Sequence, residues 1–210
     1  MNKRVRIKMC GMTRREDIMA AAHLGVDAVG LIFHPASPRH VSLEQARELV
    51  RDWPVFVDLV AVLVNPAVQV VQKILDELPV SCLQFHGDEP PEFCRQFNRP
   101  FIKAVPVMSS ASVNDAIAKY ETASALLLET PSIGVRGGSG QVFDWNLIPL
   151  QRRLPLILAG GLNTANIVQA LETCHPDAVD VCSGVESSPG IKDHDKMIRF
   201  VELAGGIHEH

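Results

Sequence analysis

The chain has 210 residues, of which 47% are hydrophobic and 21% are charged, and its formal net charge is −4. This balance is typical of an ordinary globular protein and excludes a disordered or fibrous one. The longest apolar runs are too short and interrupted to span a membrane, and no basic stripe favours nucleic acid. We therefore expect neither a membrane nor a nucleic-acid partner, and an anionic ligand would need a local binding device.

The cysteines give no sign of a disulfide framework or a structural metal site. They are five in number, with no CxxC pair and no histidine at zinc-finger spacing. The basic start of the chain is followed by too few apolar residues for a secretory signal. We predict a cytoplasmic protein without a bound metal.

Short apolar runs rich in Val, Ile, Leu and Ala recur along the whole chain and predict strands buried on both faces. The predicted strands are Arg6–Cys10, Ala28–Phe33, Leu59–Val64, Cys82–Phe85, Phe101–Ala104, Ala125–Leu128, Leu154–Ala159 and Val179–Val181.

Helix signals lie between these runs. They are capping-box spacings at Thr13 and Ser42, a proline after Asn65, a cap at Asn163 and a terminating glycine at Gly25. Strand and helix thus alternate eight times, which predicts a single-domain (β/α)8 TIM barrel over residues 1–210. A doubly wound open sheet is the rival, but its GxGxxG turn is absent, because the first turn is "CGMTRRE".

In such a barrel the loops that follow the strands carry function, and the last two loops are rich in glycine. Gly160 and Gly161 follow the seventh run, and Ser183 and Gly184 follow the eighth. Their backbone N–H groups, with a short helix starting near Val185, predict a phosphate-binding site. The alternative is that these glycines only permit tight turns.

Cys10 ends the first strand just before the first helix, a position that favours a reactive thiolate. The alternative is a buried cysteine that only packs, which is the common case. Cys82, Cys94, Cys174 and Cys182 lie inside strand or helix patterns and are predicted to be core residues.

Five segments carry a resemblance to a known family. They are "IKMCGMTRREDIMAAAHLGVDAVGLIFHPASPRHVS", "LQFHGDE", "GGSGQVFDW", "LILAGGLNTANI" and "VDVCSGVESSPGIKD". Together they resemble the phosphoribosylanthranilate isomerases of tryptophan biosynthesis. The resemblance implies a TIM barrel, monomeric or homodimeric, that uses no cofactor. It also implies a phosphorylated small-molecule substrate, N-(5′-phosphoribosyl)anthranilate, converted to 1-(2-carboxyphenylamino)-1-deoxyribulose 5-phosphate by an Amadori rearrangement.

The resemblance also implies roles for individual residues. Cys10 matches the family's general base and Arg39 an arginine that binds the anthranilate carboxylate. Glu129 stands where the family has its general acid, an aspartate, so the acid here is longer by one methylene. The alternatives for Arg39 and Glu129 are ordinary solvated loop residues.

Two further residues have weaker assignments by the same resemblance. Asp180 is expected to orient the substrate, or alternatively to make a structural hydrogen bond. His86 is expected to bind substrate or to be structural. Asp144 is predicted to cap the helix that follows it.

Two rival functions stay open at this stage. A related barrel isomerase of histidine biosynthesis performs the same rearrangement on a larger substrate, but it would resemble a paired-aspartate design in which the first strand ends on an aspartate. Cys10 argues against that assignment. A catalytically silent barrel that binds a phosphorylated metabolite is kept open by Glu129.

Overall fold

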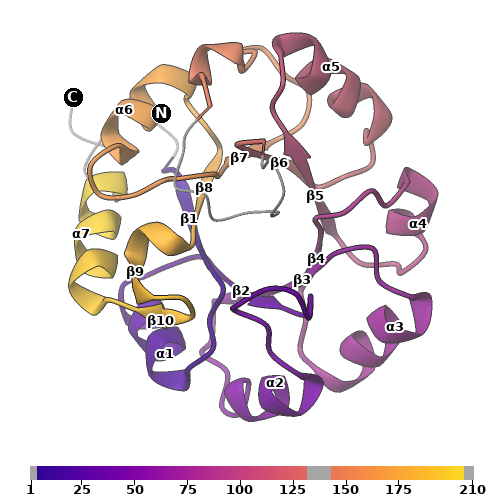
Figure 1. The fold of residues 1–210 in the computed structure, drawn as a ribbon, viewed down its shortest axis with the longest axis vertical. Coiled ribbons are helices and arrows are strands. Elements are labelled where there is room, and N and C mark those ends of the chain that lie inside the picture. The colour runs from indigo at the N-terminus through magenta and orange to yellow at the C-terminus, as the bar shows by residue number, and fades with distance from the viewer. Residues whose placement is uncertain (1–3, 132–142, 206–210) are drawn as a thin grey trace.

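A computed structural model describes residues 4–131 and 143–205. Eight parallel strands pair in chain order and close into a barrel, and Figure 1 shows the helices arranged around this ring. The strands are β1 (Arg6–Cys10), β2 (Ala28–Ile32), β3 (Asp58–Leu63), β4 (Cys82–Phe85), β5 (Phe101–Pro106), β6 (Ala125–Glu129), β7 (Leu156–Leu158) and β8 (Ala178–Val181). The predicted TIM barrel is confirmed.

Among the described residues, α-helices follow seven of the eight strands. They are α1 (Arg15–His23), α2 (Leu43–Leu49), α3 (Val68–Glu77), α4 (Pro91–Arg95), α5 (Ser110–Lys119), α6 (Ile167–Cys174) and α7 (His194–Gly205). The described part of the connection from β6 to β7 contains instead a short 3-10 helix, η1 (Trp145–Leu147), so the expected strand–helix unit is not seen there. Asp144 caps η1 by accepting a hydrogen bond from the backbone of Asn146, as predicted.

Local helix signals are confirmed where no distant group competes for them. Ser42 caps α2 in a complete capping box, and Gly25, with φ of +74°, follows α1. Three predicted starts are too early, by one residue for α1, two for α3 and three for α6. Thr13 bonds to Gly190 and Asn65 to Asp88, both far along the chain, whereas Asn163 accepts from the nearby backbone N–H of Ala165 although α6 starts only at Ile167.

The strand pleat divides the buried residues into two cores. The larger core lies between the barrel and its helices and holds residues such as Met9, Leu83 and Phe85. A smaller cluster fills the barrel interior, with members that include Val60, Leu127, Ile157 and Ala159. On β2 the interior positions are small, with Ala28 in register with Lys8 and Gly30 in register with Cys10, which leaves room for these polar groups of β1.

The chain between β8 and α7 adds a small substructure at the barrel rim. It consists of a 3-10 turn, η2 (Ser183–Val185), and an antiparallel pair, β9 (Glu186–Ser188) and β10 (Ile191–Lys192). Figure 1 places this hairpin beside α1. Among the described residues, no helix combines the length and apolar character needed to cross a membrane.

Candidate active site

The carboxyl ends of parallel barrel strands meet at one rim, where polar side chains gather. Cys10 is the last residue of β1 and Glu129 the last of β6, while His86 follows β4 directly. Asp180 lies in β8, the strand beside β1. The fold therefore brings four residues singled out in the sequence to the same end of one barrel.

The thiol of Cys10 lies over the neighbouring strand β2. Cys10 is in register with Gly30, and a Cβ atom built on Gly30 would lie 2.8 Å from the sulfur. Burial raises the pKa of Cys10, while the positive charges of Lys8 and Lys192 act in the opposite direction. The thiol thus occupies a desolvated pocket that contains nearby cations.

Glu129 is fixed by a histidine. His86 Nε2 lies 2.8 Å from Glu129 Oε1, and both side chains are largely buried. On the other side of the ring, the Gln84 amide nitrogen lies 3.1 Å from His86 Nδ1. With Gln84 donating to Nδ1, the ring proton sits on Nε2 and is donated to Glu129. Glu129 is 14% exposed, so it is not a solvated loop carboxylate.

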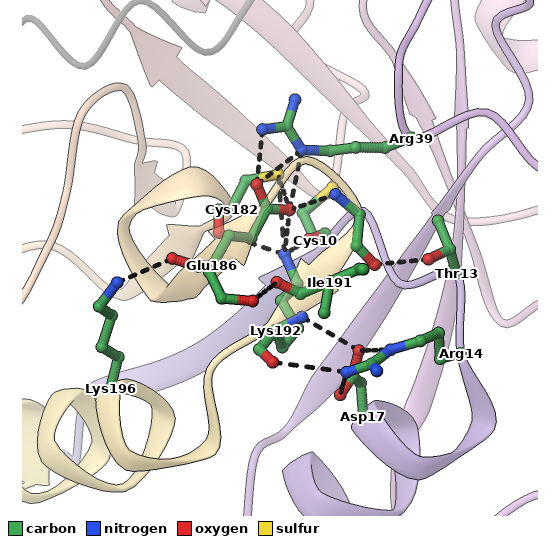
Figure 2. A network of polar contacts seen from close by, with 12 residues as sticks. Cys10, Thr13, Arg14, Asp17, Arg39, Cys182, Glu186, Ile191, Lys192 and Lys196 are labelled. Atoms are coloured by element: carbon green, nitrogen blue, oxygen red, sulfur yellow. Dashed lines mark hydrogen bonds and ion pairs between the residues drawn. The ribbon is translucent and has the colours of Figure 1, made fainter.

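Arg39 is bound to a carboxylate of the hairpin that follows β8 (Figure 2). Its Nε donates to Glu186 Oε1 over 2.8 Å, and its Nη2 donates to Glu186 Oε2 over 2.6 Å. Figure 2 shows the remaining guanidinium nitrogen turned away from Glu186. The side chain is 12% exposed, so Arg39 is fixed by its ion pair and is not a solvated loop residue.

Lys192 completes this network and ties the hairpin to the end of β1. Its ammonium donates to Glu186 Oε1 over 2.9 Å and to the backbone oxygen of Cys10 over 2.6 Å. Burial would raise the pKa of Glu186, but the Arg39 hydrogen bonds and the charge of Lys192 lower it. Glu186 is therefore an ionised anchor for two cations.

The glycine loops after β7 and β8 are in direct contact. A Cβ atom on Gly184 would lie 1.9 Å from the backbone oxygen of Leu162, which no side chain could tolerate. Gly160 and Gly161 both have left-handed backbones, with φ of +81° and +71°. Ser183 starts the turn η2, which ends at Val185, so the short helix expected to begin near Val185 begins two residues earlier.

Asp180 has one oxygen in use and one available. Its Oδ2 accepts a hydrogen bond from Lys8 over 2.9 Å. Its Oδ1 is buried and has no partner in residues 4–131 and 143–205. A buried carboxylate oxygen without a donor favours a ligand group there.

Residues 7–203 match the family model described as N-(5′-phosphoribosyl)anthranilate isomerase. A protein of that name from Legionella pneumophila (strain Corby) is 59% identical over 203 residues, covering 97% of this chain and 98% of its own. The chain belongs to the N-(5′-phosphoribosyl)anthranilate isomerase family. It is accordingly an isomerase of tryptophan biosynthesis with a TIM-barrel fold.

Two solved isomerase structures agree with this assignment. The phosphoribosylanthranilate isomerase of Thermotoga maritima is 38% identical and superposes with a TM-score of 0.89, covering 96% of this chain and 99% of its own. A second structure, also 38% identical with a TM-score of 0.86 and the same coverage, holds reduced 1-(o-carboxyphenylamino)-1-deoxyribulose 5-phosphate.

Some residues of this isomerase site were not predicted from the sequence. Glu186 and Lys192 lie in the family-like segment "VDVCSGVESSPGIKD", and their charges flanking a Pro-Gly turn are the signal that was available. Cys182, expected in the core, lies beside the site, with its sulfur 3.0 Å from the point where a Cβ on Gly11 would lie. Burial raises the pKa of Cys182 to about 12. The "GGSG" segment at 137–140 is outside the described residues.

Proposed function

We propose that Cys10 and Glu129 make the two proton transfers by which this isomerase converts N-(5′-phosphoribosyl)anthranilate to 1-(2-carboxyphenylamino)-1-deoxyribulose 5-phosphate. The observation that carries the proposal is that a thiol and a carboxyl group end strands β1 and β6 at the same rim. Strands β7 and β8 separate them around the ring, so a substrate in the mouth has one group on each side.

The reaction follows from these two groups. The carboxyl group of Glu129 protonates the furanose ring oxygen, the bond from that oxygen to C1′ breaks, and a Schiff base forms. The thiolate of Cys10 then removes the proton from C2′, and the electrons of that bond give an enolamine, which tautomerises to the keto product. Each group handles one proton, as general acid–base catalysis requires.

His86 orients the acid. Because His86 Nε2 donates to Oε1 of Glu129, the transferable proton belongs on Oε2, the oxygen that His86 leaves free. This contact also compensates for the extra methylene of glutamate, since it fixes a side chain that would otherwise have an additional rotatable bond.

Three further groups bind the substrate. The guanidinium nitrogen of Arg39 that faces away from Glu186 is available to donate a charge-assisted hydrogen bond to the anthranilate carboxylate. Oδ1 of Asp180 accepts a hydrogen bond from the substrate amine. The phosphate lies between the two touching glycine loops, on backbone N–H groups of Gly160, Gly161, Ser183 and Gly184.

The test is turnover of freshly prepared N-(5′-phosphoribosyl)anthranilate, followed by the loss of its fluorescence without added metal. Cys10→Ser should slow turnover by about three orders of magnitude, because serine is a far weaker acid than cysteine. Cys174→Ser is the matched control, since the buried Cys174 thiol donates to Ala170 O over 2.9 Å and a hydroxyl can do the same. Full activity in Cys10→Ser would refute the base assignment, and an inactive parent protein would favour the silent barrel.

We also propose that the isomerase acts in the cytoplasm as a monomer or a homodimer. The exposed apolar residues Val55 and Phe56, with exposures of 76% and 98%, are the place where a second copy would bury surface. Light scattering on the parent and on Phe56→Ser separates the two states. A dimer held there loses mass on substitution, and a monomer does not.

A further inference from the structure

A lysine lies inside the barrel beside the proposed base. Lys8 precedes Cys10 by two positions on β1, so both side chains project from the same face of the strand. The Lys8 side chain is only 4% exposed. A buried ammonium is costly and needs both a counter-charge and a reason to be retained.

The counter-charge is Asp180. Lys8 and Asp180 are in register on the neighbouring strands β1 and β8, and Lys8 Nζ lies 2.9 Å from Asp180 Oδ2. Burial lowers the pKa of Lys8, but the attraction of Asp180 and of Cys10 outweighs it, so the pKa of Lys8 is raised. The ammonium therefore stays charged across the working pH range.

The ammonium of Lys8 and the thiol of Cys10 both lie against Gly30, which has no side chain to separate them. A Cβ atom on Gly30 would lie 2.8 Å from Cys10 Sγ and 3.2 Å from Lys8 Nζ. Both atoms thus pack against the same bare backbone position on β2. An ammonium so close to a thiol in a site of low dielectric favours the thiolate.

We propose that Lys8 is a positioning residue for the isomerisation: its ammonium, held by Asp180 and packed with the Cys10 sulfur against Gly30, stabilises the thiolate form of the base. This inference rests on the proposed function, in which Cys10 removes the C2′ proton. Lys8 itself touches no reacting atom and acts through Cys10.

Other charged groups surround Cys10 and must be compared with Lys8. Burial is the largest influence and raises the pKa of Cys10; Lys8 then lowers it more than Lys192 does, while Asp180 raises it. Lys192 donates to Glu186 and to the backbone oxygens of Cys10 and Cys182, so its ammonium already has a carboxylate and two carbonyl groups as partners.

Arg39, from the loop after β2, is the remaining cation that interacts with Cys10. The carboxylate of Glu186, to which Arg39 donates hydrogen bonds, offsets the positive charge of Arg39. Cys182, from the chain just after β8, is a neutral thiol here, because burial raises its pKa to about 12. Lys8 is thus the one cation on the strand of Cys10 itself whose ammonium packs beside the sulfur.

The experiment measures the pH dependence of alkylation of Cys10 by iodoacetamide, quantified on the Cys10 peptide by mass spectrometry. Lys8→Met should move the midpoint up by about one pH unit, which is an about tenfold loss of thiolate near neutral pH. The acidic limb of the kcat/KM profile should move by the same amount. Lys8→Arg, which keeps the charge, should restore most of the thiolate.

Lys103→Met is the matched control. Lys103 is a second buried lysine on a barrel strand, and it pairs with Glu89 over 3.3 Å among outward-facing core residues. Its loss should lower stability without moving the alkylation midpoint of Cys10. A midpoint that shifts equally in the Lys8 and Lys103 variants would overturn the proposal.

A second variant keeps the test sharp if Lys8→Met does not fold. Lys8→Met combined with Asp180→Asn removes both charges, so no carboxylate is left buried without a partner. Because Lys8 outweighs Asp180 at the thiol, the midpoint should still rise, but by less. An unchanged or lowered midpoint in the folded double variant overturns the proposal.

The two proposals fail separately. If Cys10→Ser keeps its turnover while Lys8→Met raises the alkylation midpoint, then Lys8 stabilises the thiolate but Cys10 is not the base. If Cys10→Ser is inactive and Lys8→Met alkylates as the parent does, the base assignment holds and the role of Lys8 is refuted.

Discussion

Adding one methyl group at Gly184 should damage substrate binding far more than its size suggests. The new Cβ would lie 1.9 Å from the backbone oxygen of Leu162 and 2.9 Å from both Cα and Cβ of Asn163. A relaxed contact between carbon and oxygen is about 3.3 Å or longer. The loops after β7 and β8 must therefore separate by more than about 1 Å in Gly184→Ala.

The cost follows from this displacement. Overpacking of a rigid site destabilises by about 1–3 kcal/mol, since the obstacle is backbone and cannot rotate away. A shift of about 1 Å in groups that position a substrate can lower the rate about hundredfold. We expect kcat/KM of Gly184→Ala to fall by about that factor, mainly through KM, because both displaced loops carry the proposed phosphate contacts.

The assay is the fluorescence-based turnover measurement at several substrate concentrations, together with urea unfolding. Gly205→Ala is the control, because a Cβ on Gly205, at the end of α7, meets no atom of residues 4–131 and 143–205 within 4 Å. It should be neutral or slightly stabilising, as alanine is the better helix former. A folded Gly184→Ala protein with the KM of the parent would refute the phosphate site between these loops.

Three further predictions concern the rest of the site. Glu129→Asp withdraws the carboxylate from His86 by about the length of one C–C bond, so kcat should fall about ten- to hundredfold. The kcat of Glu129→Ala should fall further. Equal rates in the parent and the alanine variant would exclude Glu129 as the acid. The pKa of Glu186 is lower in the folded protein than its unfolded value of 4.5. Its ionised carboxylate therefore stabilises the fold above pH 4.5, and this stability is lost as the pH falls through the folded pKa. Glu186→Gln should thus be less stable than the parent at pH 7 but lose less on acidification, as urea midpoints would show. Gly30→Ala should slow turnover, since the added methyl would displace the Cys10 sulfur, and its alkylation rate reports this directly.

The sequence predicts the strands of this barrel well because their signal is local. Buried parallel strands are continuous apolar runs, and the predicted bounds of β1 and β4 match the structure. Helix starts are less predictable, because a capping side chain can bond elsewhere. Thr13 has the spacing of a cap but donates to Gly190, a residue 177 positions away.

The residues of the candidate site likewise divide into those with a local sequence signal and those whose partners lie far along the chain. Cys10 and Glu129 can be found from the sequence, since both end apolar runs and the ends of parallel strands share a rim. The partners of Arg39 and Lys8 cannot be found in this way. They lie 147 and 172 positions away, and only closure of the barrel places β8 and its hairpin beside β1.

The charges around Cys10 show why these distant pairs matter together. In the described part of the chain, three cations, Lys8, Lys192 and Arg39, form ion pairs with two carboxylates, Asp180 and Glu186. In the proposed mechanism the thiolate of Cys10 supplies the third negative charge, so this group is balanced when the base is ionised and carries one excess positive charge once Cys10 has taken the C2′ proton. A net positive pocket favours holding the enolamine, which still carries the anthranilate carboxylate and the phosphate, over releasing it, because the attraction between opposite charges is strong in a desolvated site. On the proposed mechanism, the same buried cations that favour the thiolate therefore also help to retain the substrate while its proton is on the enzyme.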